Sequence, residues 1–309
     1  MKRVLPLESV PVSLWEETTL LLPEPLAAAY CAELKVLGLW LDATKGTEKK
    51  DIHGGCSIEE TLEHFTHRFG VSAGRLEFVA LAPDDSLSQM SDAILSTFSD
   101  GHVALLDIPC GTGTSLGALL MTLVRLRELK LLPSLPLTIS VVGGDCSEKA
   151  LEIYDSMLAR LTPVLEHHAI VINFHLEKWD ATRSDQTASL VDHWFKLAEG
   201  AEEYFVCVSN FSGALIGAGL LEDFKPCLEQ ILGRLYDKKS TLLWIEPSRS
   251  EDVQKKLIPR IKQFFVRRIS WFHDSSVSDA PVFANYSIKN PVDGYVHTSG
   301  VEVQRFDRG

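Results

Sequence analysis

The stretch VALLDIPCGTGTSLG, residues 103–117, decides the fold of this 309-residue chain. Four apolar residues lead to Asp107, which is typical of a buried strand that ends in an acid. Gly111 and Gly113 follow, and we expect a side chain at either position to block a ligand from the backbone of this tight turn. The helix predicted from residue 114 presents free N–H groups at the same turn. The segment therefore predicts a strand, a glycine-rich turn and a helix start that together hold a nucleotide-like cofactor.

From residue 101 onward, short apolar stretches alternate with helical segments. Strands are predicted at 103–107, 138–144, 169–175, 204–209 and 241–246, and helices at 114–130, 148–162, 184–199, 219–236 and 250–264. Continuous apolar strands between helices are typical of a parallel sheet covered on both faces. Two later extended stretches, 267–272 and 282–289, fit a hairpin at the sheet edge. We therefore predict an α/β fold with a mostly parallel, seven-stranded sheet over residues 101–309.

Residues 1–100 are predicted to be mostly helical and to form a separate region. Segment 24–41 has apolar residues on most faces, which predicts a buried helix. Ser57 and Glu60 have the spacing of a capping box, which marks a helix start. Segment 44–56 between them is polar, charged and glycine-containing, which predicts a mobile loop. We expect this N-terminal region to act as a lid or substrate-binding region gated by that loop, or else simply to cover the sheet.

The charge of the chain limits its partners. The formal net charge is −12 and the pI is about 5.3, which argues against unaided, non-specific binding to nucleic acid. The stretch from Lys255 to Arg268 is basic without a single acid. It can bind RNA or an acidic partner, or it can be a solvated helix face on an acidic body.

Cysteine usage and hydropathy indicate a cytoplasmic protein. Six cysteines stand at positions 31, 56, 110, 146, 207 and 227, and no pair has CxxC spacing. We expect all six to be reduced, as is usual in the cytosol. The first residues lack the apolar run of a secretory signal, and no stretch approaches the roughly 18 apolar residues of a membrane span.

Acids also follow the second and third predicted strands of the sheet. Asp145 comes directly after the second strand, and Asp180 comes just after the third. Parallel strands of an open α/β sheet bind ligands at their carboxyl ends, and an acid after the second strand can accept both hydroxyls of a ribose. The three acids, with Asp107, therefore indicate one ligand site at this edge.

The runs DIPCGTGT, GGDCS and WDAT together resemble the class I S-adenosylmethionine-dependent methyltransferase superfamily over about residues 100–290. The resemblance implies a Rossmann-like sheet and transfer of the methyl group of S-adenosylmethionine to an acceptor by in-line displacement. It implies that Asp107 contacts the methionine part directly or through water, that Asp145 holds the ribose and that Asp180 contacts the adenine amino group. The implied cofactor-binding residues are Asp107, Pro109, Cys110, Gly111, Thr112, Gly113, Asp145, Cys146, Ser147, Asp180, Ala181 and Ser209.

The sequence departs from this family at two points, and one other cofactor competes. Pro109 replaces the family's first glycine, and the gap from Asp107 to Asp145 exceeds the roughly 20 residues of the dinucleotide fingerprint. A nicotinamide cofactor, and with it an oxidoreductase, would require glycine three residues after Gly113, where Leu116 stands. The residues therefore favour the methyl donor.

The fourth strand ends at the position that faces the transferred methyl group in this superfamily. Asn210 can accept a hydrogen bond from a nitrogen nucleophile, and Phe211 can wall the pocket, so these two are the candidate catalytic residues. The alternative is a polar turn without catalysis, which would leave an S-adenosylmethionine-binding subunit or sensor. After the fifth strand, Glu246 either contacts substrate or, with Ser248, caps the next helix.

The methyl acceptor is not specified by any motif. The acidity of the chain favours a small molecule or a protein, and the basic stretch keeps RNA as an alternative. Metal binding by His64 and His67, one helical turn apart with Cys56 nearby, is less favoured than an ordinary helix surface, so no metal is predicted.

Overall fold

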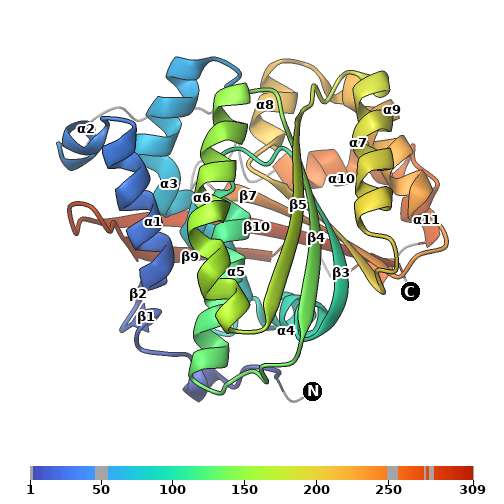
Figure 1. Ribbon diagram of the computed structural model, residues 1–309. Coiled ribbons are helices and arrows are strands. Elements are labelled where there is room, and N and C mark those ends of the chain that lie inside the picture. Colours follow the sequence, from blue (N-terminus) through green and yellow to red (C-terminus); the bar gives the residue numbers. More distant parts are fainter. Residues whose placement is uncertain (1–2, 46–54, 249–256, 275, 278–281, 309) are drawn as a thin grey trace.

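The computed structural model describes residues 3–45, 55–248, 257–274, 276–277 and 282–308 (Figure 1). Within these residues one mixed sheet has ten strands, and nine of them lie in the order β1-β2-β9-β10-β7-β6-β3-β4-β5. The five parallel strands that the sequence predicts are all present. They are β3 (Gly101–Asp107), β4 (Leu137–Asp145), β5 (Ile170–Lys178), β6 (Glu203–Ser209) and β7 (Ser240–Ser248).

Strand β3 lies in the middle of the five parallel strands, where the strand order reverses. The chain runs from β3 to β4 and β5 on one side, then returns to β6 and β7 on the other side. This is the order of a doubly wound α/β sheet, whose ligands bind outside the carboxyl ends of the strands where the order reverses. Asp107 ends β3 at this point and lies opposite Gly143 of β4 and Cys207 of β6.

The late hairpin differs from the predicted one. Its strands are β9 (Val282–Lys289) and β10 (Val296–Arg308), and β10 lies antiparallel between β7 and β9 rather than at the edge. The predicted strand 267–272 is wrong, because part of it belongs to the short helix α11 (Trp271–Asp274). Neighbouring Trp271 and Phe272 both pack into one core, whereas neighbours on a strand would point to opposite faces.

The sheet is also larger than the seven strands predicted. The N-terminal region contributes β1 (Trp15–Glu16) and β2 (Thr19–Leu21), and β2 pairs in parallel with β9. A tenth strand, β8 (Ser276–Val277), pairs with β10. The region before residue 101 is therefore helical only in part, because its first segment extends the sheet.

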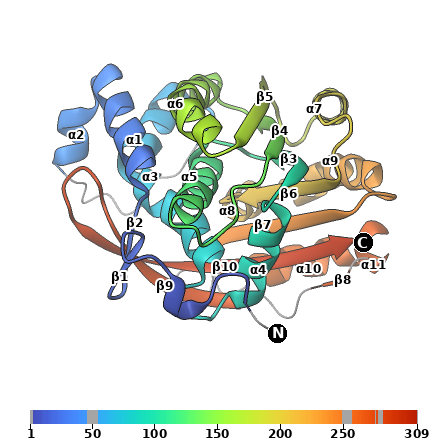
Figure 2. The same ribbon diagram turned by 60° about the horizontal axis from the view of Figure 1, so that its bottom comes forward.

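Helices cover the sheet in two layers (Figure 2). Five pack against one face around the larger core: α1 (Glu24–Val36), α3 (Ile58–Leu81), α4 (Ser88–Thr97), α5 (Thr114–Glu128) and α6 (Glu148–His167). The opposite face carries α7 (Ser184–Leu197), α8 (Ser212–Gly217), α9 (Leu221–Arg234), α10 (Leu257–Val266) and α11. A short 3₁₀ turn, Leu7–Ser9, precedes β1. No described helix is long and apolar enough to span a membrane.

Two N-terminal predictions are refined by the structure. The predicted helix 24–41 divides into α1 and α2 (Trp40–Thr44), with Gly38 between them at a φ of +72°. The capping box of Ser57 and Glu60 is present and starts α3, which then runs 24 residues to Leu81. The predicted gating loop 44–56 lies mostly outside the described residues, which resume at residue 55.

Candidate functional site

The turn after β3 is fastened to the neighbouring strand, and its two glycines have different roles. The backbone N–H of Cys110 donates to the carbonyl of Gly144, with an N–O distance of 2.9 Å. Gly111 has a φ of +52° and faces open space, so its missing side chain leaves the backbone accessible to a ligand. Gly113, at +71°, faces Tyr154 instead, and an added Cβ would lie 2.0 Å from that ring. Packing against Tyr154 is therefore the reason for glycine at 113, and contact of Gly113 with a ligand stays a prediction.

Asp107 is a buried acid with one carboxylate oxygen left unpaired. Tyr154 donates its hydroxyl to Oδ2 at 3.1 Å, while Oδ1 has no hydrogen-bond partner among the described residues. Burial raises the pKa of Asp107 to about 8; the hydrogen bond from Tyr154 opposes this rise, and the negative charge of Asp145 adds to it. Asp107 also lines a cavity of about 10 Å³, roughly the space of one water molecule, among otherwise apolar side chains and Cys207.

Asp145 holds the turn in place from the end of β4. Its Oδ2 accepts the N–H of Gly111, and its Oδ1 accepts the N–H of Ser147, each at 2.9 Å. Burial raises the pKa of Asp145, and hydrogen bonds from Ser147, Gly111 and Cys146 oppose that rise. Each oxygen of a carboxylate has a second lone pair, so Asp145 can still accept a hydroxyl group. The structure therefore brings Asp107, Gly111 and Asp145 together, as predicted.

The loop after β4 is linked to the N-terminal region by a covalent bond that the sequence analysis missed. Cys56, just before α3, forms a disulfide with Cys146, which corrects the prediction that all cysteines are reduced. In addition, Thr61 of α3 and Ser147 share a hydrogen bond between their hydroxyls at 2.6 Å. The partners of the disulfide are 90 residues apart, and only the placement of α3 beside the end of β4 brings them together. The other four cysteines, Cys31, Cys110, Cys207 and Cys227, are free thiols.

Asp180 lies in a local turn of its own. Its Oδ1 accepts both the backbone N–H and the hydroxyl of Thr182, at 2.9 and 2.8 Å. This is the short side-chain-to-backbone turn that aspartate commonly forms before a helix. The residue is exposed, and the next residue, Ala181, packs against the smaller core. Contact of Asp180 with an adenine group stays a prediction.

The end of β6 is hydrogen-bonded to two helices of the same layer, α5 and α3. Ser209 lies 3.1 Å from Ser115 of α5, hydroxyl to hydroxyl. Asn210 adopts a φ of +59°, and its Oδ1 accepts a hydrogen bond from Arg75, a buried residue of α3. The ring of Phe211 lies 6.5 Å from that of Trp179. The two candidate catalytic residues are therefore held beside α3 and the loop after β5.

Glu246 stabilises the start of α8. This buried carboxylate accepts the N–H groups of Phe211 and Ser212, the Ser212 hydroxyl and the Trp244 indole N–H, at 2.7 to 3.0 Å, all on Oε1. An acid at a helix N-terminus is favoured by the helix dipole. Of the two predicted roles, capping is the one that the contacts show, and the capped helix is α8 rather than the next one, with no part for Ser248.

Further predicted positions have local contacts that leave their cofactor roles as predictions, or lie outside the described residues. Thr112 and Thr114 share a hydrogen bond between their hydroxyls at 3.0 Å, within the turn. Pro109 follows a cis peptide bond in that turn. Cys56 is bound in the disulfide, so no thiolate is available there for a metal site with His64 and His67. Of the basic stretch, residues 255–256 and the side chains up to residue 261 lie outside the described part.

Two buried residues of the site were missed from the sequence. Tyr154 donates to Asp107, and its pKa is raised well above the ordinary value by burial and by the charge of Asp107. Arg75 reaches Asn210 from a helix far away in the chain. Tyr154 stands four residues after Ala150 and three before Met157, and this spacing places it on the inward face of α6, which is a signal that sequence reasoning can use.

Comparison with known proteins adds little. No protein-family profile matches the chain, and no curated protein matches it. A solved structure described as "Conversion of a Disulfide Bond into a Thioacetal Group during Echinomycin Biosynthesis" is similar at 15% identity, over 70% of this chain and 81% of that chain, with a TM-score of 0.33. At such values the fold assignment rests on the strand order of this chain itself.

Proposed function

We propose that this protein binds S-adenosylmethionine at the carboxyl ends of β3 and β4 and transfers its methyl group to an acceptor. The observation that carries the proposal is the pair Asp107 and Gly111. Asp107 offers a buried carboxylate oxygen without a partner, and Gly111 leaves the neighbouring backbone open. An unpaired buried acid is costly, and a cation that reaches it removes that cost. The donor supplies such a cation in its ammonium group.

The chain's residues have distinct tasks in this proposal. Asp107 accepts the ammonium group directly or through one water molecule in the adjoining small cavity. Asp145 keeps its backbone contacts and accepts the ribose hydroxyls. The N-terminus of α5 places its free N–H groups beside the turn and attracts the carboxylate of the methionine part.

The methyl-transfer step requires few catalytic groups from the protein. The sulfonium of the donor supplies a reactive methyl group, so orienting the acceptor and excluding water can provide most of the rate. Arg75 fixes the amide of Asn210, whose oxygen retains a second lone pair for an N–H group of the acceptor. Phe211 supplies an apolar wall, and the buried Trp179 lies behind it. These residues orient the acceptor and keep water out.

Calorimetric titration of the full chain with S-adenosylmethionine, S-adenosylhomocysteine and NADPH tests the proposal. We expect both sulfur compounds to bind with one site per chain and NADPH not to bind. Asp107→Ala and Asp145→Ala should each weaken binding at least tenfold, while Asp155→Asn, an exposed acid of α6, should leave it unchanged. Binding of NADPH alone would refute the proposal, and unchanged affinity in both site variants would show that the site is elsewhere.

A catalytically silent binding protein is the second candidate, and one contact favours it. Arg75 already occupies one acceptor position of Asn210, the residue proposed to receive the nucleophile. Incubation with labelled donor and a panel of small amines, thiols, peptides and RNA separates the two candidates. A labelled product supports the enzyme, whereas donor binding without any product supports a subunit or sensor. The net charge of −12 favours the small molecules and peptides of this panel.

A further inference from the structure

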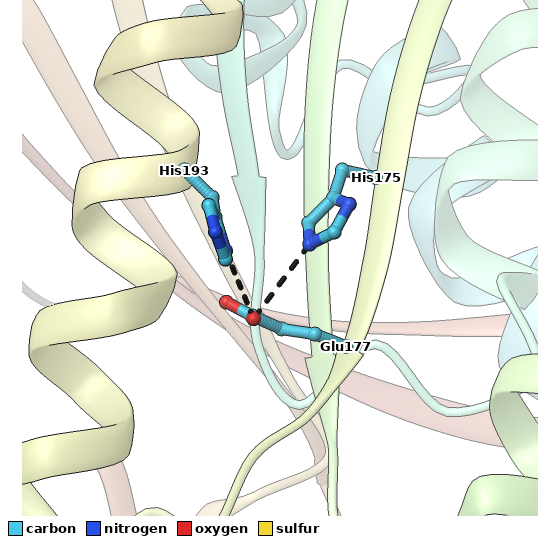
Figure 3. Close-up of side chains that lie close together, drawn as sticks. All are labelled: His175, Glu177 and His193. Atoms are coloured by element: carbon cyan, nitrogen blue, oxygen red, sulfur yellow. Dashed lines mark hydrogen bonds and ion pairs between the residues drawn. The ribbon is translucent and has the colours of Figure 1, made fainter.

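Three potential metal ligands lie together on the face of the sheet opposite α6. His175 and Glu177 are two residues apart on β5, so their side chains leave the strand on the same side. His193 belongs to α7, the helix that packs on that side. Figure 3 shows Glu177 between the two imidazole rings, with one carboxylate oxygen facing a nitrogen of each.

The distances define one convergent point. The Oε2 atom of Glu177 lies 3.0 Å from Nδ1 of His193 and 3.6 Å from Nε2 of His175. One ligand atom from each of the three residues lies within 4.8 Å of the other two. The two imidazole rings are 4.6 Å apart between centroids and tilted by 65°, so they are not stacked flat on each other. An ion placed among these atoms could reach all three with small side-chain rotations.

The cluster also leaves two buried polar atoms unsatisfied. Nε2 of His175 and Oε1 of Glu177 are both shielded from solvent and lack a hydrogen-bond partner among the described residues. A buried polar atom left without a hydrogen bond costs about 1–3 kcal/mol, and a bound ion is one arrangement that removes this cost. Two buried atoms without a hydrogen bond in one cluster of three residues, with the ion-pair contacts of Glu177 made through Oε2 rather than Oε1, are a second observation beside the convergence of the ligand atoms.

We propose that His175, Glu177 and His193 bind a zinc ion. Two imidazoles and one carboxylate are a set that zinc accepts, whereas magnesium and calcium prefer oxygen ligands throughout. The side chains of both histidines are a little under half exposed, at 43% and 45%, so an ion has a path to the site. With three protein ligands, the fourth position of a tetrahedral ion remains for water or for a group from outside the chain.

The bound ion would connect α7 to β5, the last strand on its side of the sheet. None of the three ligands belongs to the cofactor site proposed above. Zinc binding is therefore separate from methyl transfer, and either proposal can fail without the other. The direct consequence of zinc binding is that the attachment of α7 to the sheet depends on the metal.

Zinc titration of the chelator-treated, untagged full chain tests this site. We expect one equivalent to bind and to raise the melting temperature. Glu177→Gln and His193→Gln should each weaken binding at least tenfold, whereas His167→Gln, an exposed histidine on α6, should not change it. Variants with the wild-type melting temperature before zinc is added will show that lost binding is not lost folding.

X-ray absorption of the zinc-loaded protein identifies the ligands independently. We expect nitrogen and oxygen neighbours at about 2.0–2.2 Å and no sulfur at about 2.3 Å. The proposal would be overturned by a sulfur neighbour or by absence of zinc binding to the wild-type chain. It would also be overturned if Glu177→Gln and His193→Gln bound zinc as tightly as the wild type. The Cys31→Ser variant, which removes a half-buried thiol, should bind zinc like the wild type, and loss of binding there would also overturn it.

Discussion

Replacing Asp107 by asparagine should make the protein more stable, and increasingly so as the pH rises. The pKa of Asp107 is raised to about 8 in the folded chain, mainly by burial. In the unfolded chain an aspartate has its ordinary pKa of about 3.9. Between these values the folded state holds a proton that the unfolded state has released. Stability therefore falls with rising pH across this window, which is the reverse of a salt-bridged aspartate.

The size of this effect follows from the two pKa values. Each pH unit in the window costs about 1.4 kcal/mol of unfolding free energy, so the penalty reaches about 4 kcal/mol at pH 7 and levels off above pH 8. Asparagine has the same shape, carries no charge and can still accept the hydroxyl of Tyr154. Asp107→Asn should therefore match the wild type near pH 4 and exceed it by about 4 kcal/mol at pH 7.

Urea unfolding of both proteins at pH 5, 6, 7 and 8 measures this difference. Other buried acids, such as Glu77 and Glu246, also have raised pKa values, but they contribute equally to both proteins and cancel in the comparison. The control variant Asp155→Asn shows how the loss of one exposed acid changes the free energy of unfolding at each pH. A difference between Asp107→Asn and the wild type that does not change with pH, or that favours the wild type at pH 8, would refute the reasoning.

Three further predictions concern the turn, the disulfide and the cap of α8. In urea unfolding, Gly111→Ala should lose about 1 kcal/mol of stability because of its positive φ, and in calorimetric titration it should bind the donor at least tenfold more weakly. Gly113→Ala should lose about 3 kcal/mol in urea unfolding because its Cβ meets Tyr154. Cys56→Ser opens a disulfide that closes a loop of about 90 residues, so urea unfolding should show a loss of about 4 kcal/mol. Glu246→Ala leaves three donors, the N–H groups of Phe211 and Ser212 and the Ser212 hydroxyl, without their acceptor, while the Trp244 indole keeps the Ser212 hydroxyl; the loss should be about 4 kcal/mol in the same assay.

Each of these predictions has its own contrary result. Equal stability and equal affinity of the two alanine variants would show that the glycines are equivalent. A free thiol at Cys146 in the purified protein, detected by mass spectrometry after alkylation, would contradict the disulfide. Cys31→Ser, which removes a thiol that forms no disulfide, is the matched control. A loss below about 1 kcal/mol in Glu246→Ala would mean that α8 does not depend on that acid.

The predicted parallel strands were recovered because their signal is local. Short apolar runs such as 103–107 and 204–209 have the length of strands and lie between turn signals and helical segments, which together favour buried strands. The capping box at Ser57 is local as well, since its two partners are three residues apart. The turn after β3 was recognised from Gly111, whose positive φ and open side the structure confirms.

The features that were missed depend on contacts between distant segments. β10 contains the buried polar residues Glu302 and Gln304, so it does not read as an apolar strand. The role of Gly113 depends on a tyrosine 41 residues later, and the disulfide on a partner 90 residues away. The ligand set of the proposed zinc site combines a strand and a helix, and only the alternation of His175 and Glu177 along β5 hints at it from sequence.

A crystal structure of the complex with S-adenosylhomocysteine tests the central claim most directly. We predict that the ligand lies against the backbone of Gly111, with its ammonium group bound to Asp107, directly or through one water molecule, and its ribose hydroxyls bound to Asp145. Ligand bound away from the carboxyl ends of β3 and β4, or bound there without contact to either acid, would contradict the proposed site.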